Sequence, residues 1–321
     1  MKRFLVIAGG LILSAVCTLS AAGPAETAAG LTARIPAGSM TLRDGGWFYS
    51  RSEFEHIGKG ELTGKRVVEV SNCKRKKAAD PAAALQNFHD QLARLGIALI
   101  IVPVPPKSAF YPPAGMRSGE ALQYLLPYYE ELRKNGLDIL DPSVLFRQHP
   151  EVCSFCRTDA HWSPAGIRLT VDALAEKIPL RGTSDFAIRK HPVRITGDLA
   201  GPADASAKEN LELETVSGNT FSEDSPVLVI GDSHTLVFSA GGDMLADHSG
   251  FCELLAAKLK MPVDRIGVRG SASSSVRIDL FRKSVRRPDW IRRKKYVIYL
   301  FSCREFTETI SGWSLVPVLK K

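Results

Sequence analysis

The sequence predicts an α/β fold built around a mainly parallel sheet. Helix-like and apolar strand-like segments alternate along the chain, which is typical of that class. Residues 97–104 form a continuous apolar run, as expected for a strand buried on both faces. A second run, residues 226–230, ends in Gly231-Asp232-Ser233. This places a serine at the carboxyl end of a strand, where α/β sheets hold their sites.

Length and composition fit one large globular domain or two small ones. The chain has 321 residues, 45% of them hydrophobic and 24% charged, so it can bury a substantial core. The formal net charge of +8 suits an anionic polymer or a membrane surface, and equally an ordinary solvated surface. No nucleic-acid-binding motif is recognisable. We expect residues 41–321 to form the domain.

The first residues have the pattern of a secretory signal. Lys2 and Arg3 precede the apolar residues 4–19, and Ser20-Ala21-Ala22 is a small-residue cleavage site. We therefore expect a signal peptide over residues 1–22 and a periplasmic protein, with a retained inner-membrane anchor as the alternative. Residues 23–40, rich in Ala, Gly and Thr, are expected to be a flexible linker.

The first half of the domain contains several elements with recognisable ends. Short strands are expected at 45–49 and 67–70. Asp80-Pro81 begins a helix that Gly96 ends, and the strand at 97–104 follows. The next expected elements are a helix at 120–135, a short strand at 137–140, a helical segment from Pro142, and a helix at 164–178 capped by Ser163.

The second half opens with a polar segment, residues 181–225, which we expect to be irregular with at most one short hairpin. The strand that leads to Ser233 comes next. The remaining pattern predicts a helix at 249–260, a strand at 263–268, a serine-rich loop at 270–275, a helix at 276–284 and a last strand at 296–301.

Ser233 is the candidate nucleophile. A serine needs a base, and a base needs an orienting carboxylate. Asp159-Ala160-His161 supplies both upstream, at alternate positions of an extended segment that project to one side. The predicted triad is therefore Ser233, His161 and Asp159. The alternatives are a simple turn serine, His234 as the base, and Asp159 as a helix-capping residue.

Other polar residues near the motif and further along the chain are candidates for supporting roles. Asp232 fits a turn position, and the Ser233 N–H is an expected oxyanion donor. A second donor from residues 270–275 and substrate contacts by Arg277 and Arg304 are hypotheses, with a plain loop and structural ion pairs as the alternatives.

Five cysteines follow the signal segment: Cys73, Cys153, Cys156, Cys252 and Cys303. Cys153 and Cys156 have CxxC spacing, but a structural zinc site needs four ligands. A disulfide, either local or longer-range, is therefore favoured over zinc. Cys252 and Cys303 are expected in the core. We expect no cofactor and no metal.

At these motifs the chain resembles the SGNH hydrolase-like O-acetyltransferases of bacterial exopolysaccharides, the DHHW-type AlgJ/AlgX family of alginate acetylation. The matching residues are Gly46-Trp47-Phe48, Val102-Pro103-Val104-Pro105 with Lys107 and Tyr111, Thr158-Asp159-Ala160-His161-Trp162-Ser163, and Gly231-Asp232-Ser233. The Asp-x-His motif precedes the serine, as in the family's permuted order. Residues 270–275 match the family's loop only loosely.

The resemblance implies a three-layer α/β/α fold and a periplasmic enzyme. Such an enzyme receives acetyl from a membrane-bound O-acyltransferase and passes it, through an acyl-serine, to hydroxyls of an alginate-like polysaccharide. A carbohydrate acetylesterase and a catalytically silent polysaccharide-binding component of an acetylation complex are the alternatives.

Overall fold

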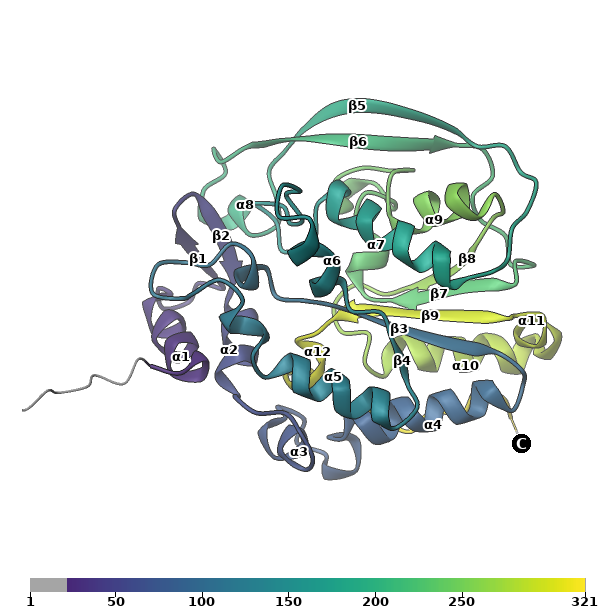
Figure 1. Cartoon of the computed structure of the whole chain (residues 1–321), viewed down its shortest axis with the longest axis horizontal. Coiled ribbons are helices and arrows are strands. Elements are labelled where there is room, and N and C mark those ends of the chain that lie inside the picture. The colour runs from purple at the N-terminus through teal and green to yellow at the C-terminus, as the bar shows by residue number, and fades with distance from the viewer. Residues whose placement is uncertain (1–21, 321) are drawn as a thin grey trace, which may run out of the picture.

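The centre of the protein is a five-stranded parallel sheet (Figure 1). The computed structural model describes residues 22–320, so the predicted signal peptide lies outside the described residues up to its last position. The strands follow the order β4-β3-β9-β7-β8. Their bounds are Ala98–Val104 for β3, Asp138–Ile139 for β4, Val227–Gly231 for β7, Asp264–Gly267 for β8 and Tyr296–Ser302 for β9. The predicted α/β class with a mainly parallel sheet is confirmed.

Helices cover both faces of the sheet and make three layers (Figure 1). One face carries α4 (Pro81–Ala93), α5 (Leu125–Lys134) and α10 (Ser275–Arg286). The other carries α6 (Pro142–Gln148), α7 (Pro164–Lys177) and α9 (Phe251–Leu259). The three-layer α/β/α arrangement implied by the resemblance is therefore present.

The layers follow from the alternation of side chains along buried strands. In β3, Ile101 belongs to the core that includes Phe88 of α4. Its neighbour Ile100 belongs to the opposite core, with Val171 of α7. A strand apolar on both faces thus joins two separate cores, which is why the run at 97–104 shows no polar alternation.

Two helix starts in the sequence are confirmed by their caps. The Asp80 carboxylate accepts a hydrogen bond from the Ala83 amide at 3.0 Å, ahead of α4. The Ser163 hydroxyl accepts one from Gly166 N at 3.1 Å, ahead of α7. The second cap fixes where the loop before α7 ends, and that loop carries the Asp-x-His motif.

Two antiparallel hairpins lie outside the sheet. The first pairs β1 (Thr41–Asp44) with β2 (Trp47–Ser50). The second pairs β5 (Ala187–Ile195) with β6 (Glu209–Ser217) through nine register pairs, and it arches over α7 and α9 (Figure 1). The polar segment at 181–225 is therefore more regular than predicted. Most residues of β5 are exposed, and β6 buries only Glu209, Leu213 and Val216, so the hydrophobic pattern is weak beside that of the central sheet.

Two expectations near the amino end are wrong. Residues 24–34 are a helix, α1 (Pro24–Arg34), and not a flexible linker. Ala28 and Leu31 share one side of α1, three residues apart, and are buried in the core beside α2 (Arg51–Gly58). Residues 66–70 form a short helix, α3 (Arg66–Val70), and not a strand.

The remaining helices are short: α8 (Ala200–Ala203), α11 (Pro288–Arg292) and α12 (Glu305–Glu308). None of the helices within residues 22–320 is long and apolar enough to cross a membrane. The strands β3, β7 and β9 run in parallel, so their carboxyl ends meet at one edge of the sheet. The predicted site residues gather at this edge.

Candidate active site

Ser233 lies two residues after the carboxyl end of β7, at the start of a turn of 3₁₀ helix over residues 233–235. Gly231 allows this geometry, because a Cβ there would lie 1.9 Å from the Leu300 carbonyl oxygen of β9. The Asp232 carboxylate fixes the turn by accepting hydrogen bonds from His234 N at 2.9 Å and Ser302 N at 2.7 Å. Ser233 itself stays partly exposed.

Asp159 and His161 lie on the loop between α6 and α7. An isolated antiparallel bridge joins Phe155 to Trp162 within this loop. The Trp162 ring is fully buried and stacks on Phe251 of α9, with ring centroids 5.6 Å apart. The packing of Trp162 therefore anchors the loop immediately beside His161.

The three predicted triad side chains form a continuous chain of hydrogen bonds. Ser233 Oγ lies 2.7 Å from His161 Nε2, and His161 Nδ1 lies 2.6 Å from Asp159 Oδ1. Asp159 also accepts a hydrogen bond from His161 N at 2.9 Å. With Nδ1–H donated to the carboxylate, Nε2 is left to accept the serine proton.

The buried environment shifts both ionisable groups. Burial opposes the charge on Asp159, but the charge and hydrogen bonds of His161 outweigh it and hold the pKa of the carboxyl well below its usual range. Burial also opposes the imidazolium of His161, yet the Asp159 charge and hydrogen bond raise the pKa of the ring above its usual value. Such an arrangement can orient a histidine base and stabilise its protonated form.

Lys107 holds the loop that carries Asp159 and His161 in place. Its ammonium, on a side chain only 1% exposed, donates hydrogen bonds to the carbonyls of Cys156 at 3.0 Å and Asp159 at 2.7 Å. Burial lowers the pKa of Lys107, while the carboxylates of Glu53 and Asp159 act in the opposite direction. Lys107 comes shortly after the carboxyl end of β3, and this position was the available sequence signal.

The segment between β5 and β6 also contacts the loop that carries Asp159 and His161, and it holds that loop in place. Asp198 N donates to Asp159 Oδ2 at 2.9 Å, and Asp198 Oδ1 accepts from Ala160 N at 2.7 Å. Gly197 makes this approach possible, since a Cβ there would lie 2.4 Å from Asp159 Cβ. At the start of β6, the Glu209 carboxylate accepts hydrogen bonds from the backbone amides of Arg157 and Thr158. Sequence reasoning missed these residues, because only the folded chain brings them to the loop.

His234 is placed differently from the alternative that made it the base. Its Nδ1 lies 2.9 Å from Asp232 Oδ1, and its buried ring packs against His161 with centroids 4.8 Å apart. Burial and the neighbouring His161 lower the pKa of His234, although Asp232 opposes them. His161, and not His234, is hydrogen-bonded to Ser233.

The loop at 270–275 is tied to the last helix. Ser271 and Ser273 share hydrogen bonds with Thr309, and Glu305 accepts one from Ser273 N. Burial raises the pKa of Glu305 to about 7. A second oxyanion donor in this loop stays a prediction.

The two arginines differ. Arg277 is fully buried and donates to the Ser273 carbonyl, so its role is structural. Arg304 is half-buried and lines a small polar cavity with His234 and Ser302.

The remaining features are the five cysteines and one cluster of possible metal ligands. All five cysteines in the described part of the chain are free, so the expectation of a disulfide, local or longer-range, is wrong. The Cys156 thiol faces the Trp162 carbonyl instead. Asp159, His161 and Asp198 place possible ligand atoms within 4.8 Å of one another. Both carboxylate oxygens of Asp159 and one of Asp198 already accept the hydrogen bonds described above, so we assign this cluster to the positioning of His161.

A three-layer parallel fold with a serine, histidine and aspartate hydrogen-bonded at the carboxyl edge defines an SGNH hydrolase-like protein. The sequence model of the family described as "SGNH hydrolase-like domain, acetyltransferase AlgX" matches residues 44–289, most of the chain. The protein therefore belongs to this AlgX-type family, as the resemblance indicated.

Individual relatives agree with this family. The chain is 29% identical over 150 residues to a probable alginate O-acetylase AlgJ of Pseudomonas syringae pv. tomato. That match covers 42% of this chain and only 33% of the relative.

Two solved structures share the fold. The O-acetyltransferase domain of Pseudomonas putida AlgJ has a TM-score of 0.60 at 20% identity, covering 83% of this chain and 91% of that one. Pseudomonas aeruginosa AlgX has a TM-score of 0.58 at 17% identity, covering 86% and 65%.

Proposed function

We propose that this protein is an O-acetyltransferase that moves acetyl groups onto hydroxyls of an exopolysaccharide through an acyl-serine. The observation that carries the proposal is the hydrogen-bonded chain from Ser233 through His161 to Asp159. Membership of a family described as acetyltransferases supports the same reaction.

In the first half-reaction, Ser233 Oγ attacks the acetyl carbonyl carbon while His161 Nε2 takes its proton. The negative charge that develops on the carbonyl oxygen is stabilised by backbone donors, among them Ser233 N–H. The tetrahedral intermediate then breaks its bond to the donor oxygen. His161 returns the proton to that oxygen, leaving acetyl-Ser233.

In the second half-reaction, a sugar hydroxyl gives its proton to His161 and attacks the acetyl carbon. The bond to Ser233 Oγ breaks, and His161 reprotonates the serine. Asp159 keeps its charge throughout and stabilises the imidazolium in both steps. Water in place of the sugar would give an acetylesterase, so access of the acceptor decides the outcome.

We further propose that the acceptor is alginate-like and that the acetyl donor is a membrane-bound O-acyltransferase. The name of the AlgJ relative supports the first point. The signal-like pattern of residues 1–22 supports a periplasmic location, with inner-membrane association if that segment is retained.

Intact-mass measurement after incubation with a small acetyl ester tests the proposal, with and without a polysaccharide acceptor. We expect an acetyl adduct on the wild-type protein, discharge onto the sugar, and no adduct on Ser233→Ala. Ser222→Ala, at a partly buried turn serine away from the triad, is the matched control and should behave as wild type.

Discharge only to water would replace the transferase with the esterase. Absence of any adduct on correctly folded wild-type protein would favour the silent component and contradict the acyl-serine mechanism.

A further inference from the structure

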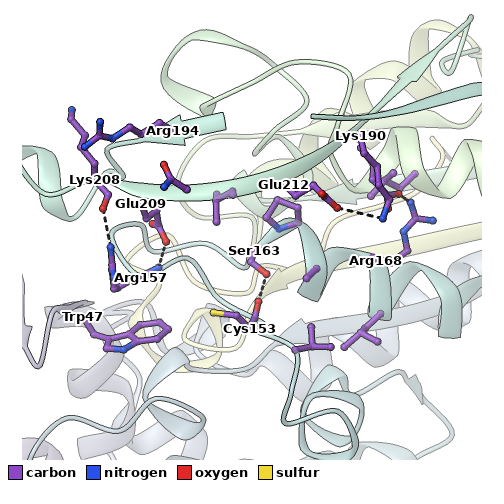
Figure 2. Close-up of a pocket in the computed structure, with 18 residues that line it drawn as sticks. Trp47, Cys153, Arg157, Ser163, Arg168, Lys190, Arg194, Lys208, Glu209 and Glu212 are labelled. Atoms are coloured by element: carbon purple, nitrogen blue, oxygen red, sulfur yellow. Dashed lines mark hydrogen bonds and ion pairs between the residues drawn. The ribbon is translucent and has the colours of Figure 1, made fainter. Parts of the chain in front are cut away.

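A large groove lies between the β5–β6 hairpin and the body of the protein, and the triad does not line it. Its cavity has a volume of about 850 Å³, within the range of about 300–1,000 Å³ usual for ligand sites. Figure 2 shows hairpin residues on one side and the loop before α7 on the other.

The charges in the groove are unevenly paired. At one end Lys190 forms ion pairs with Glu212 at 3.4 Å and Glu214 at 3.5 Å, and Arg168 also pairs with Glu214. These charges largely neutralise one another, so this end offers little attraction for a charged ligand.

The other end, which we call the basic end, holds Arg157, Arg194 and Lys208. All three are exposed, and in the described part of the chain none forms an ion pair with a carboxylate. The Arg157 guanidinium donates to the Lys208 carbonyl at 2.8 Å, and the Lys208 ammonium contacts the Thr196 hydroxyl.

One carboxylate, that of Glu209, lies within the basic end. It is buried and accepts hydrogen bonds from Arg157 N and Thr158 N, both at 2.8 Å, and from the Thr158 hydroxyl. Its oxygens therefore face the backbone of the loop. The basic end keeps a surplus of positive charge, which favours an anionic ligand.

An aromatic ring lies beside these cations. Trp47 is half-buried, lines the groove and stacks on Tyr111 with centroids 4.0 Å apart and an interplanar angle of 13°. Figure 2 shows its indole near Arg157. The stack holds the indole rigidly, so it offers a large apolar surface at little entropic cost. Cations beside a rigid flat ring suit a ring-shaped ligand that carries carboxylates.

The groove and the triad share one loop. Arg157 in the groove wall precedes Asp159 by two residues, and Thr158 between them is held by Glu209. A sugar residue in the groove is not the one beside Ser233, because the triad does not line the groove. A ligand that occupies both sites must therefore be a polymer.

We propose that this groove binds a carboxylated stretch of the acceptor polysaccharide, with uronate groups at Arg157, Arg194 and Lys208 and a sugar ring against Trp47. The inference rests on the proposed function, because it takes the acceptor of that reaction as the ligand. It adds to that function a binding site outside the triad.

Calorimetric titration of the full-length Ser233→Ala protein with a defined oligouronate tests the proposal. We expect binding that weakens as salt rises, and no comparable binding of a neutral oligoglucan of equal length. Adding Arg194→Gln and Lys208→Gln should weaken binding about tenfold, as the loss of two exposed charge contacts predicts. It should also flatten the salt dependence.

A matched control removes two exposed arginines elsewhere, Arg286→Gln and Arg292→Gln, with the same change in net charge. This control should bind as the parent does. Adding Trp47→Leu should weaken binding without changing the salt dependence. Equal loss in the control, equal binding of the neutral oligomer, or tighter binding of a sulfated than of a carboxylated oligomer would each overturn the proposal.

Acyl-serine formation by the wild-type protein, measured in parallel, separates the two claims. An acyl-serine without oligouronate binding would contradict the groove assignment alone. Oligouronate binding without an acyl-serine would contradict the catalytic proposal and keep the groove as a polyanion site.

Discussion

Replacing Lys107 with methionine tests whether the buried ammonium of Lys107 positions the loop that carries Asp159 and His161. Methionine is unbranched like lysine and one atom shorter, and it donates no hydrogen bond, so the Cys156 and Asp159 carbonyls lose their bonds to the ammonium. Each buried group left unpaired costs about 1–3 kcal/mol. Because the variant no longer buries an ammonium, part of that cost is offset. We expect a net loss of about 2–4 kcal/mol in the free energy of unfolding.

The effect on chemistry should exceed the effect on folding. A displacement of the Asp159 backbone moves the carboxylate that orients His161, and a misplacement near 1 Å can cost about 100-fold in rate. The assay is single-turnover acetylation of Ser233, followed by intact mass at a temperature where unfolding measurements show the variant to be folded.

Lys294→Met is the matched control. Lys294 is fully buried and donates to the carbonyls of Glu223 and Ser225, and it also pairs with Asp264 at 2.8 Å. It lies beside the amino end of β9, away from the triad. The control should lose at least as much stability but keep its acetylation rate per folded molecule. A folded Lys107→Met protein that acetylates Ser233 at the wild-type rate would refute the positioning argument.

Three further changes give distinct readouts. The Asp159 carboxylate raises the pKa of His161, so acetylation should rise with pH through a midpoint above 6.5. Asp159→Asn should move that midpoint lower and cut the plateau about 10⁴-fold; an unmoved midpoint in a stopped-flow pH series would count against the pairing. Gly197→Ala forces a Cβ to 2.4 Å from that of Asp159 and should cost about 1–3 kcal/mol in denaturant unfolding. Gly201→Ala, with open space around its Cβ, should be neutral. Equal losses of stability in the two variants would contradict the close contact of Gly197 with the loop that carries Asp159. Cys153 is the exposed thiol among the described cysteines and should alkylate first in the native protein; peptide mapping that finds a buried cysteine labelled equally fast would argue against the packing.

The sequence could predict the triad arrangement because its signals are local. Ser233 ends an apolar strand, and Asp159 and His161 stand two residues apart before a capped helix. Each of these short motifs predicts its own local conformation, and a parallel sheet brings the carboxyl ends of its strands together. The 2.6 and 2.7 Å contacts follow from that geometry.

The supports of the triad could not be predicted in the same way. Gly197 and Glu209 reach the loop only because a hairpin folds back over α7, and no local pattern specifies that return. Lys107 followed a strand end, but nothing in the sequence showed that its ammonium would bond two carbonyls. Helix α1 was missed because Gly and Thr lower helix propensity, and tertiary burial of Leu31 overrides that preference.

The position of β9 in the sheet constrains the order in which the protein can fold. This strand, the last in sequence, lies between β3 and β7 and pairs Ala98 with Tyr296 across nearly two hundred residues. A nascent chain that ends before residue 296 lacks β9, so the β3–β4 pair and the β7–β8 pair are not joined. The apolar edges of β3 and β7 are then open, and the strand ends that carry the triad are not held at one edge of a sheet. Contacts so distant in sequence form slowly, and exposed strand edges favour aggregation. The unfinished chain is therefore most prone to associate with its own copies before the final strand is available.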